Sequence, residues 1–191
     1  MAVPGYPEVY SLPRGELVPN SRLPVLVYRH VLPQPWNAET AREFCEANHW
    51  QKRGEWGVIT VPHFHPNSHE CYAVFQGSSR LVLGREQDDT SATGVEVDVF
   101  PGDIIVIPAG VSHRSLSSSG NYRYIGVYPE TGPRWRNVFC QHDESVNELV
   151  KEIGTVEVPE HDPVFGLGGP LVLIWSKALG RHNHREVSAK L

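Results

Sequence analysis

The middle of the chain is a series of short β-branched and aromatic runs separated by Gly- and Pro-containing turns. The six runs are residues 57–61, 71–75, 80–83, 95–100, 104–107 and 122–128. Turn sequences such as Gly77-Ser78-Ser79, Pro108-Ala109-Gly110 and Ser119-Gly120-Asn121 lie between them. Runs of this length and spacing are typical of an antiparallel sandwich or a small barrel. The sequence therefore predicts a mainly β core over residues 56–130.

The segment before this core is expected to wrap around it. Residues 1–35 are rich in proline, which predicts an N-terminal arm with one edge strand at 23–28. A short helix is predicted over residues 37–47, with Asn37 as its N-cap.

The segment after the core is expected to pack on it as part of the same domain, which spans residues 1–191. Residues 143–176 are predicted to supply a helix that ends at Gly154 and a buried strand at 171–175. Residues 177–191 resemble a solvated tail.

Charge and composition exclude several classes of partner. The formal net charge of the 191 residues is -5, and the 17 Lys and Arg residues form no basic stripe, so nucleic acid is not an expected partner. No apolar run approaches the roughly 20 residues needed to cross a membrane, and the N-terminus lacks the features of a signal peptide. The three cysteines are widely spaced, which argues against a disulfide framework. We therefore expect the whole chain to be the mature, cytoplasmic protein.

Two segments bring metal-binding types of side chain together. His63 and His65 are separated by one residue on an expected strand, so their side chains point to the same face. The four residues after them form a turn that brings Glu70 back opposite the two imidazoles. In the second segment, a turn ends the apolar strand at 104–107, and His113 begins the next strand, where it can supply a fourth ligand.

Taken together, these segments resemble the paired motifs of the cupin superfamily. The first motif, Gly57-(five)-His63-Phe64-His65-(four)-Glu70-(six)-Gly77, agrees at every fixed position. The second, Gly102-(five)-Pro108-Ala109-Gly110-(two)-His113, departs only at its last position, where Ser117 replaces the usual asparagine. That asparagine is generally not a metal ligand, so the departure leaves the metal site intact. Residues 63–70 and 162–171 are also similar to the small single-domain cupins of the YjlB-like group.

The resemblance implies a double-stranded β-helix, a small jelly-roll barrel, that holds one divalent transition metal through His63, His65, Glu70 and His113. Three imidazoles and one carboxylate suit Fe, Mn, Ni, Co, Cu or Zn better than Mg or Ca. An octahedral ion with these four ligands keeps two positions for water, a small-molecule substrate or dioxygen.

Three functions are compatible with such a site. The first is a metal-dependent oxygenase that cleaves a small oxygen-rich substrate such as an enolate or a catechol. The second is a redox-neutral isomerase, lyase, decarboxylase or cyclase, in which Tyr72 or Glu70 moves a proton. The third is a binding module without catalysis. Open metal positions favour the two enzymes, with the oxygenase placed first.

The alternation of side chains along a strand predicts where the residues next to Glu70 point. Tyr72 lies at even spacing from Glu70, so it shares the inward face, either to orient substrate and deliver a proton or as a packed core tyrosine. Cys71 faces away from the metal as a buried thiol, and His69 is expected at the barrel mouth or on the surface. Cupins commonly pair through strands and arms, so residues 1–35 are a candidate for exchange across a homodimer.

Overall fold

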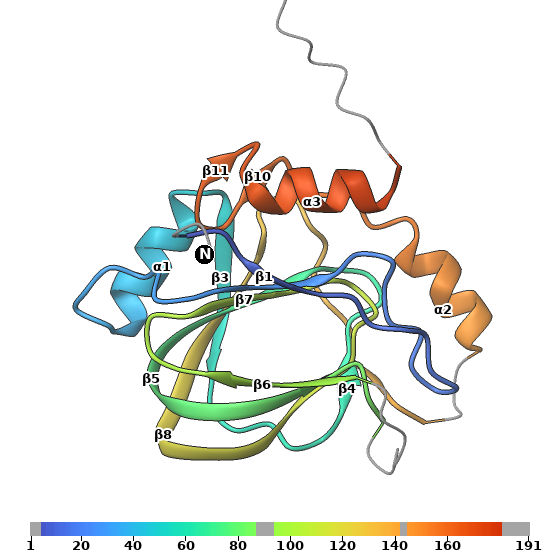
Figure 1. Cartoon of the computed structure of the whole chain (residues 1–191), viewed down its shortest axis with the longest axis horizontal. Helices are drawn as coiled ribbons and strands as arrows, with labels where there is room; N and C mark the ends of the chain where they lie inside the picture. Colours follow the sequence, from blue (N-terminus) through green and yellow to red (C-terminus); the bar gives the residue numbers. More distant parts are fainter. Residues whose placement is uncertain (1–4, 87–93, 142–144, 181–191) are drawn as a thin grey trace, which may run out of the picture.

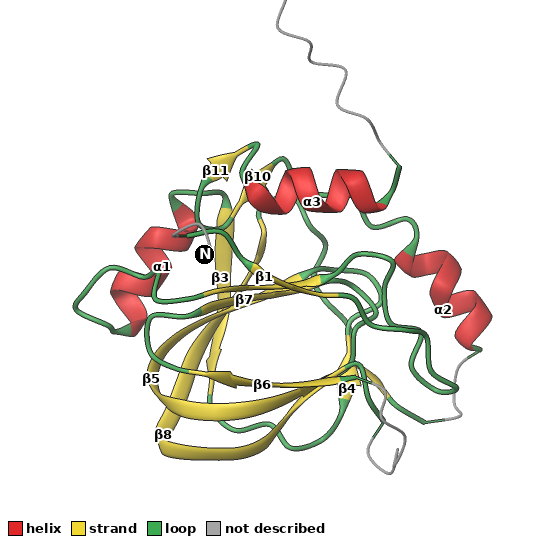
Figure 2. Cartoon of the chain, in the orientation of Figure 1, coloured by secondary structure: helices red, strands yellow, loops and turns green. Residues whose placement is uncertain are grey.

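The chain folds around one curled antiparallel sheet, shown by a computed structural model that describes residues 5–86, 94–141 and 145–180. The elements, in chain order, are β1 (Glu8–Tyr10), β2 (Val25–Tyr28), α1 (Ala38–Glu46), β3 (Trp50–Trp56), β4 (His63–Phe64), β5 (Glu70–Leu83), β6 (Val95–Val99), β7 (Ile104–Ile107), β8 (His113–Pro129), β9 (Val138–Phe139), α2 (Val146–Ile153), β10 (His161–Asp162), β11 (Gly166–Leu167) and α3 (Pro170–Ala178). Among the described residues the main sheet has the order β1-β2-β7-β5-β8-β4-β9, with β3 paired to β8 and β6 paired to β5. It curls into a half-barrel, with the helices on its outside (Figures 1 and 2). The prediction of a mainly β fold is confirmed.

Two large clusters of buried apolar residues pack against the sheet, one on each of its faces. Tyr72 and Tyr124 belong to the layer inside the barrel. Cys71 belongs to the outer layer, where it is covered together with Ala41 and Cys45 of α1 and Leu171 and Trp175 of α3. This alternation along β5 agrees with the parity argument from the sequence, which placed Cys71 and Tyr72 on opposite faces.

The two longest strands pass through positions where the sequence predicts turns. Residues 71–75 and 80–83 belong to the single strand β5, and the turn expected at Gly77 is a bulge within it. Gly77 has φ +61°, and a Cβ built there would lie 2.5 Å from the carbonyl oxygen of Ser119. A glycine thus marks a close approach of two backbones here, and the predicted turn is wrong. The turn expected at 119–121 lies within β8 in the same way.

The strand predicted at 57–61 lies earlier in the chain. Residues 57–61 are irregular, and the strand is β3, which ends at Trp56. Trp56 lies against two glycines, since a Cβ built at Gly54 or at Gly126 would come 2.2 Å from its ring.

The N-terminal arm is an integral part of the sheet. Strand β2 lies between β1 and β7, and all four of its residues are buried, so the prediction of an edge strand at 23–28 is wrong. Strand β1 is the edge. The apolar run of β2 is continuous because both faces of the strand are covered.

Residues 171–175, predicted as a strand, belong to helix α3. Pro170 occupies the first turn, where its missing N–H costs nothing. Asp162 accepts a hydrogen bond from the backbone N–H of Leu171 at 2.8 Å, which satisfies a group that the glycine N-cap leaves open. Leu171 and Trp175 lie one helical turn apart and are both fully buried. A short apolar run is compatible with either a strand or a helix. Here Pro170 and the hydrogen bond from Leu171 to Asp162 favour the helix.

The other two helices form near the predicted places. In α1, the side chain of Asn37 accepts hydrogen bonds from the backbone N–H groups of Glu39 and Thr40, as an N-cap does. Helix α2 ends at Gly154, as expected, and begins after Ser145. The tail expected over 177–191 lies, from residue 181 on, outside the described residues. Among the described residues, no helix combines the length and the apolar character that crossing a membrane requires.

Candidate metal centre

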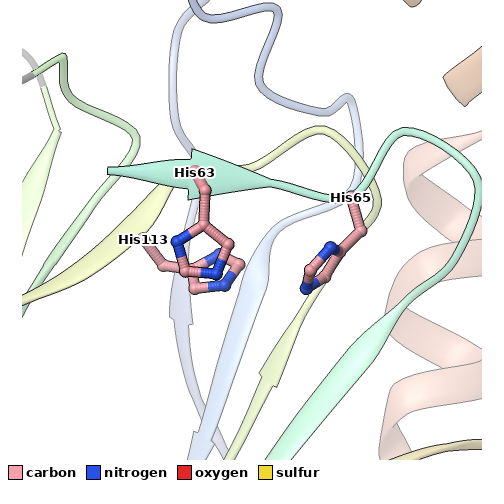
Figure 3. A group of neighbouring side chains, drawn as sticks. All are labelled: His63, His65 and His113. Carbon is pink, nitrogen blue, oxygen red and sulfur yellow. The ribbon is translucent and has the colours of Figure 1, made fainter. Parts of the chain in front are cut away.

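Three histidines converge at one end of the barrel (Figure 3). His63 on β4 lies directly opposite His113, the first residue of β8, and their ring centroids are 4.4 Å apart. His65 follows β4 directly, and its ring centroid lies 5.4 Å from that of His113. All three are buried, and one nitrogen from each lies within 4.8 Å of the others.

Backbone carbonyls fix which nitrogen of each ring faces the cluster. The Nδ1 atoms of His63, His65 and His113 each lie 3.0 Å from a carbonyl oxygen, of Val61, Arg136 and Val111 respectively. A carbonyl only accepts, so each Nδ1 carries the proton and donates it. In a neutral imidazole the Nε2 atom is then a bare lone pair, which is the form that binds a metal. Burial, followed by the charge of His113, lowers the pKa of His63 to about 3, which keeps this ring neutral.

Glu70, the first residue of β5, completes the cluster. Its Oε2 atom lies 3.0 Å from Nε2 of His65 and 3.2 Å from Nε2 of His113. Burial alone would raise the pKa of Glu70, but the charge that His65 and His113 can carry and the hydrogen bond with His65 hold that pKa well below its usual range. The buried side chain is therefore a carboxylate and offers an anionic oxygen to the cluster.

The donor set fits a divalent transition metal. Nε2 of His113 is buried and has no hydrogen-bond partner among the described residues, because its contact with Glu70 lacks the geometry of a hydrogen bond. Leaving such an atom unsatisfied is costly, and a cation placed among the ring nitrogens would satisfy it. Three imidazole nitrogens and one carboxylate oxygen are ligands for Fe, Mn, Co, Ni, Cu or Zn. The assignment of His63, His65, Glu70 and His113 as ligands stays a prediction.

The turn before β8 ties the two motifs together. Gly110 has φ +88°, and its N–H donates to the carbonyl oxygen of His65 at 2.9 Å. A Cβ at this position would lie 2.5 Å from the side chain of Ile153 and 2.7 Å from the carbonyl oxygen of Asn20. Only glycine meets both demands, the positive φ and the missing side chain. Ser117, the departing position of the second motif, is exposed on β8 and lies outside the histidine cluster.

His69 is buried, so the expectation that it lies on the surface is wrong. Its ring lies 4.6 Å from that of Trp175 on α3, measured between centroids. Its Nδ1 accepts a hydrogen bond from the N–H of Ala109, and its Nε2 donates to the carbonyl oxygen of Glu157. Both nitrogens are occupied, so this histidine supports the loops around the centre and has no lone pair to offer a metal.

Tyr72 shares the inward face with Glu70, as its parity predicts. Its ring centroid is 5.8 Å from that of His113, and it stacks on Tyr124 at 3.9 Å. Burial, followed by the charge of Glu70, raises its pKa well above the usual range, so the phenol stays protonated. The stacking on Tyr124 fits a packed core tyrosine, and the role of Tyr72 in proton delivery stays a prediction.

Two aromatic residues next to the centre were missed by the sequence analysis. Tyr128 donates its phenolic proton to Oε1 of Glu70 at 2.5 Å, and its ring stacks on Trp135. Tyr128 lies at even spacing from Tyr124 on the same strand, which was a signal of its inward orientation. Trp135 lies in an irregular segment, where no periodicity indicates a side-chain direction.

The sequence is similar to one known protein family and to a bacterial protein. The cupin family model matches residues 53–152. An uncharacterized protein of Bacillus subtilis strain 168, YjlB, is 29% identical over 171 residues, which cover 89% of this chain and 97% of that protein.

Similar solved structures include larger plant proteins. Procruciferin, an 11S globulin from Brassica napus, is 14% identical with a TM-score of 0.36, and the match covers 71% of this chain and 32% of that one. The vicilin of Capsicum annuum is 16% identical with a TM-score of 0.34, covering 74% of this chain and 37% of that one. The chain thus spans about a third of the length of these two proteins.

Proposed function

Because this chain belongs to the cupin family, we propose that its cluster of three histidines and Glu70 holds one divalent transition-metal ion and makes the protein a metalloenzyme. The proposed substrate is a small, oxygen-rich organic molecule. The supporting observation is that three buried imidazoles, each held by a backbone carbonyl through Nδ1, turn their Nε2 atoms toward one another and toward a carboxylate.

The charge of the site supports the substrate class. A divalent ion with three neutral imidazoles and one carboxylate retains a net charge of about +1, which attracts an anionic oxygen such as that of an enolate or a phenolate. The ion would supply Lewis-acid or redox chemistry at its open positions. The protein supplies a protonated phenol, Tyr72, beside His113, together with an enclosing wall of aromatic rings.

Two reaction classes follow from different features of the site. The nitrogen-rich ligand set suits metals that change oxidation state, which supports an oxygenase that cleaves its substrate with dioxygen. The phenol of Tyr72, which stays protonated, can donate a proton in a reaction without oxidation, which supports an isomerase, lyase, decarboxylase or cyclase. We place the oxygenase first.

Elemental analysis and oxygen dependence test this proposal. We expect protein purified without added metal to contain close to one transition-metal ion per chain, and iron together with oxygen consumption on addition of an enol or catechol supports the oxygenase. Turnover under nitrogen by the zinc or manganese form would favour the redox-neutral class. Metal-loaded protein that binds such compounds and turns none over would contradict the assignment as an enzyme.

A further inference from the structure

We propose that Tyr128 is a positioning residue for Glu70: it holds one carboxylate oxygen and leaves the other as the single oxygen ligand of the ion. This inference rests on the metal centre proposed above. It concerns a residue that neither motif contains.

The two oxygens of Glu70 have different partners. The phenol of Tyr128 donates to Oε1 at 2.5 Å, whereas Oε2 lies 3.0 Å from Nε2 of His65 and 3.2 Å from Nε2 of His113. Tyr128 is 1% exposed and Glu70 is 4% exposed, so bulk water does not compete for the hydrogen bond between them.

The phenol ring is itself held in place. It stacks on Trp135, with ring centroids 4.7 Å apart and planes 10° apart, and Trp135 meets Trp56 edge-on at 5.9 Å. The residue after Trp135, Arg136, provides the carbonyl that accepts from Nδ1 of His65. One segment between β8 and β9 thus supports both a histidine of the cluster and the tyrosine that orients the carboxylate.

This arrangement affects how the carboxylate can bind an ion. A carboxylate with both oxygens free can bind a cation through one oxygen or through two. With Oε1 engaged by a donor, binding through Oε2 alone is favoured, and a coordination position that the second oxygen would occupy is kept for a substrate. Hydrogen-bond partners of metal ligands typically change metal affinity about 10- to 100-fold.

Titration with Co²⁺ tests the role of Tyr128. Metal-free wild type, Tyr128→Phe and Tyr28→Phe would each be titrated, with the Kd and the visible ligand-field spectrum as readouts. Tyr28 is the matched control, because its buried phenol also donates to a buried carboxylate, that of Asp162 at 2.5 Å, outside the histidine cluster. We expect Tyr128→Phe to raise the Kd for Co²⁺ about 10-fold or more and to change the spectrum, and Tyr28→Phe to leave both unchanged.

The outcomes separate this inference from the proposal on which it rests. An unchanged Kd and spectrum in Tyr128→Phe overturn the positioning role while the metal centre stands. Wild-type protein that binds no Co²⁺ overturns the metal centre itself. Trp135→Leu provides a second variant should Tyr128→Phe fail to fold: it keeps the phenol but removes its stacking partner, and we expect a smaller increase in Kd. A Kd equal to that of wild type in Trp135→Leu would then count against the proposal.

Discussion

His65 and His69 show how hydrogen bonds, rather than burial, separate the roles of two similar residues. Both are buried, at 4% and 2% exposed, and they lie four positions apart. His65 uses only Nδ1 for a backbone partner, and its Nε2 meets Oε2 of Glu70 at 3.0 Å, a contact that an ion bound between the two atoms would replace. His69 uses both nitrogens for backbone partners, and burial lowers its pKa to about 4, so its ring is neutral and fully engaged. The first ring is therefore available to a metal and the second is structural.

Alanine substitutions at these two positions should affect different properties, metal binding at His65 and stability at His69. We expect His65→Ala to abolish stoichiometric metal binding, because it removes one of three imidazoles, while the β-rich circular dichroism spectrum is retained. We expect His69→Ala to keep its metal and to lose about 2–3 kcal/mol of unfolding free energy, because it leaves a cavity and an unsatisfied buried N–H at Ala109. Metal content by mass spectrometry and urea unfolding of the metal-free proteins measure the two effects.

His49→Ala, which alters an exposed histidine paired with Glu130, is the control that should change neither metal content nor stability. Full metal occupancy in His65→Ala would contradict the ligand assignment.

At the scale of elements, helix α3 depends on one buried carboxylate. Oδ1 of Asp162 accepts from the N–H groups of Val164 and Phe165, and Oδ2 accepts from Leu171 and from the phenol of Tyr28. The aspartate thus joins the segment before α3, the first turn of α3 and strand β2. Because its acceptor positions face donors, an amide in its place would turn an NH₂ group toward an N–H.

Asp162→Asn is therefore expected to destabilise the fold without disturbing the metal centre. We expect a loss of about 2–3 kcal/mol of unfolding free energy, since hydrogen bonds to a charged group contribute more than neutral ones. The urea midpoint of the metal-free protein measures this loss, and the Kd for Co²⁺ should stay at the wild-type value. Asp98→Asn, which alters an exposed aspartate paired with Arg80, serves as the comparison and should change stability little. Equal midpoints for the two variants would refute this account of α3.

The cupin fold was predictable from the sequence because its motifs carry backbone requirements as well as ligands. Gly110 marks a positive φ and a close contact, and His63 and His113 begin strands that face each other. Helix α3 was not predictable, since its apolar run suits a strand and its capping carboxylate lies eight residues before Pro170 in the chain. The contact of Tyr128 with Glu70 joins residues 58 positions apart, and periodicity along one strand says nothing of such a partner.

At the scale of the whole molecule, the N-terminal arm belongs to the barrel. Val27 is fully buried on β2, whereas Val9, on the neighbouring edge strand β1, is 46% exposed. An exchange of residues 1–35 between two copies would therefore have to carry β2 out of the sheet. The homodimer expected from the sequence stays a prediction, to be checked by sedimentation velocity of the full chain.

An aspartate placed on β1 or on β2 tests whether each strand is part of the folded core. We expect Val27→Asp to prevent cooperative folding, because a carboxylate would be buried there without a partner. We expect Val9→Asp to fold with a urea midpoint near that of the wild type, because its side chain reaches water. Soluble yield and urea unfolding provide the measurements. A stably folded Val27→Asp would show that the first two strands are dispensable.

Strand β4 has only two residues, yet it pairs with β8 on one side and β9 on the other. So short a ladder contributes few backbone bonds, and it is the part of the sheet where the histidines meet. An ion that joined positions 63 and 113 would act as a cross-link, closing a long loop of chain much as a disulfide does. Part of its binding energy would then stabilise the pairing of β4 with β8, so that metal loading and the stability of this end of the barrel would rise together.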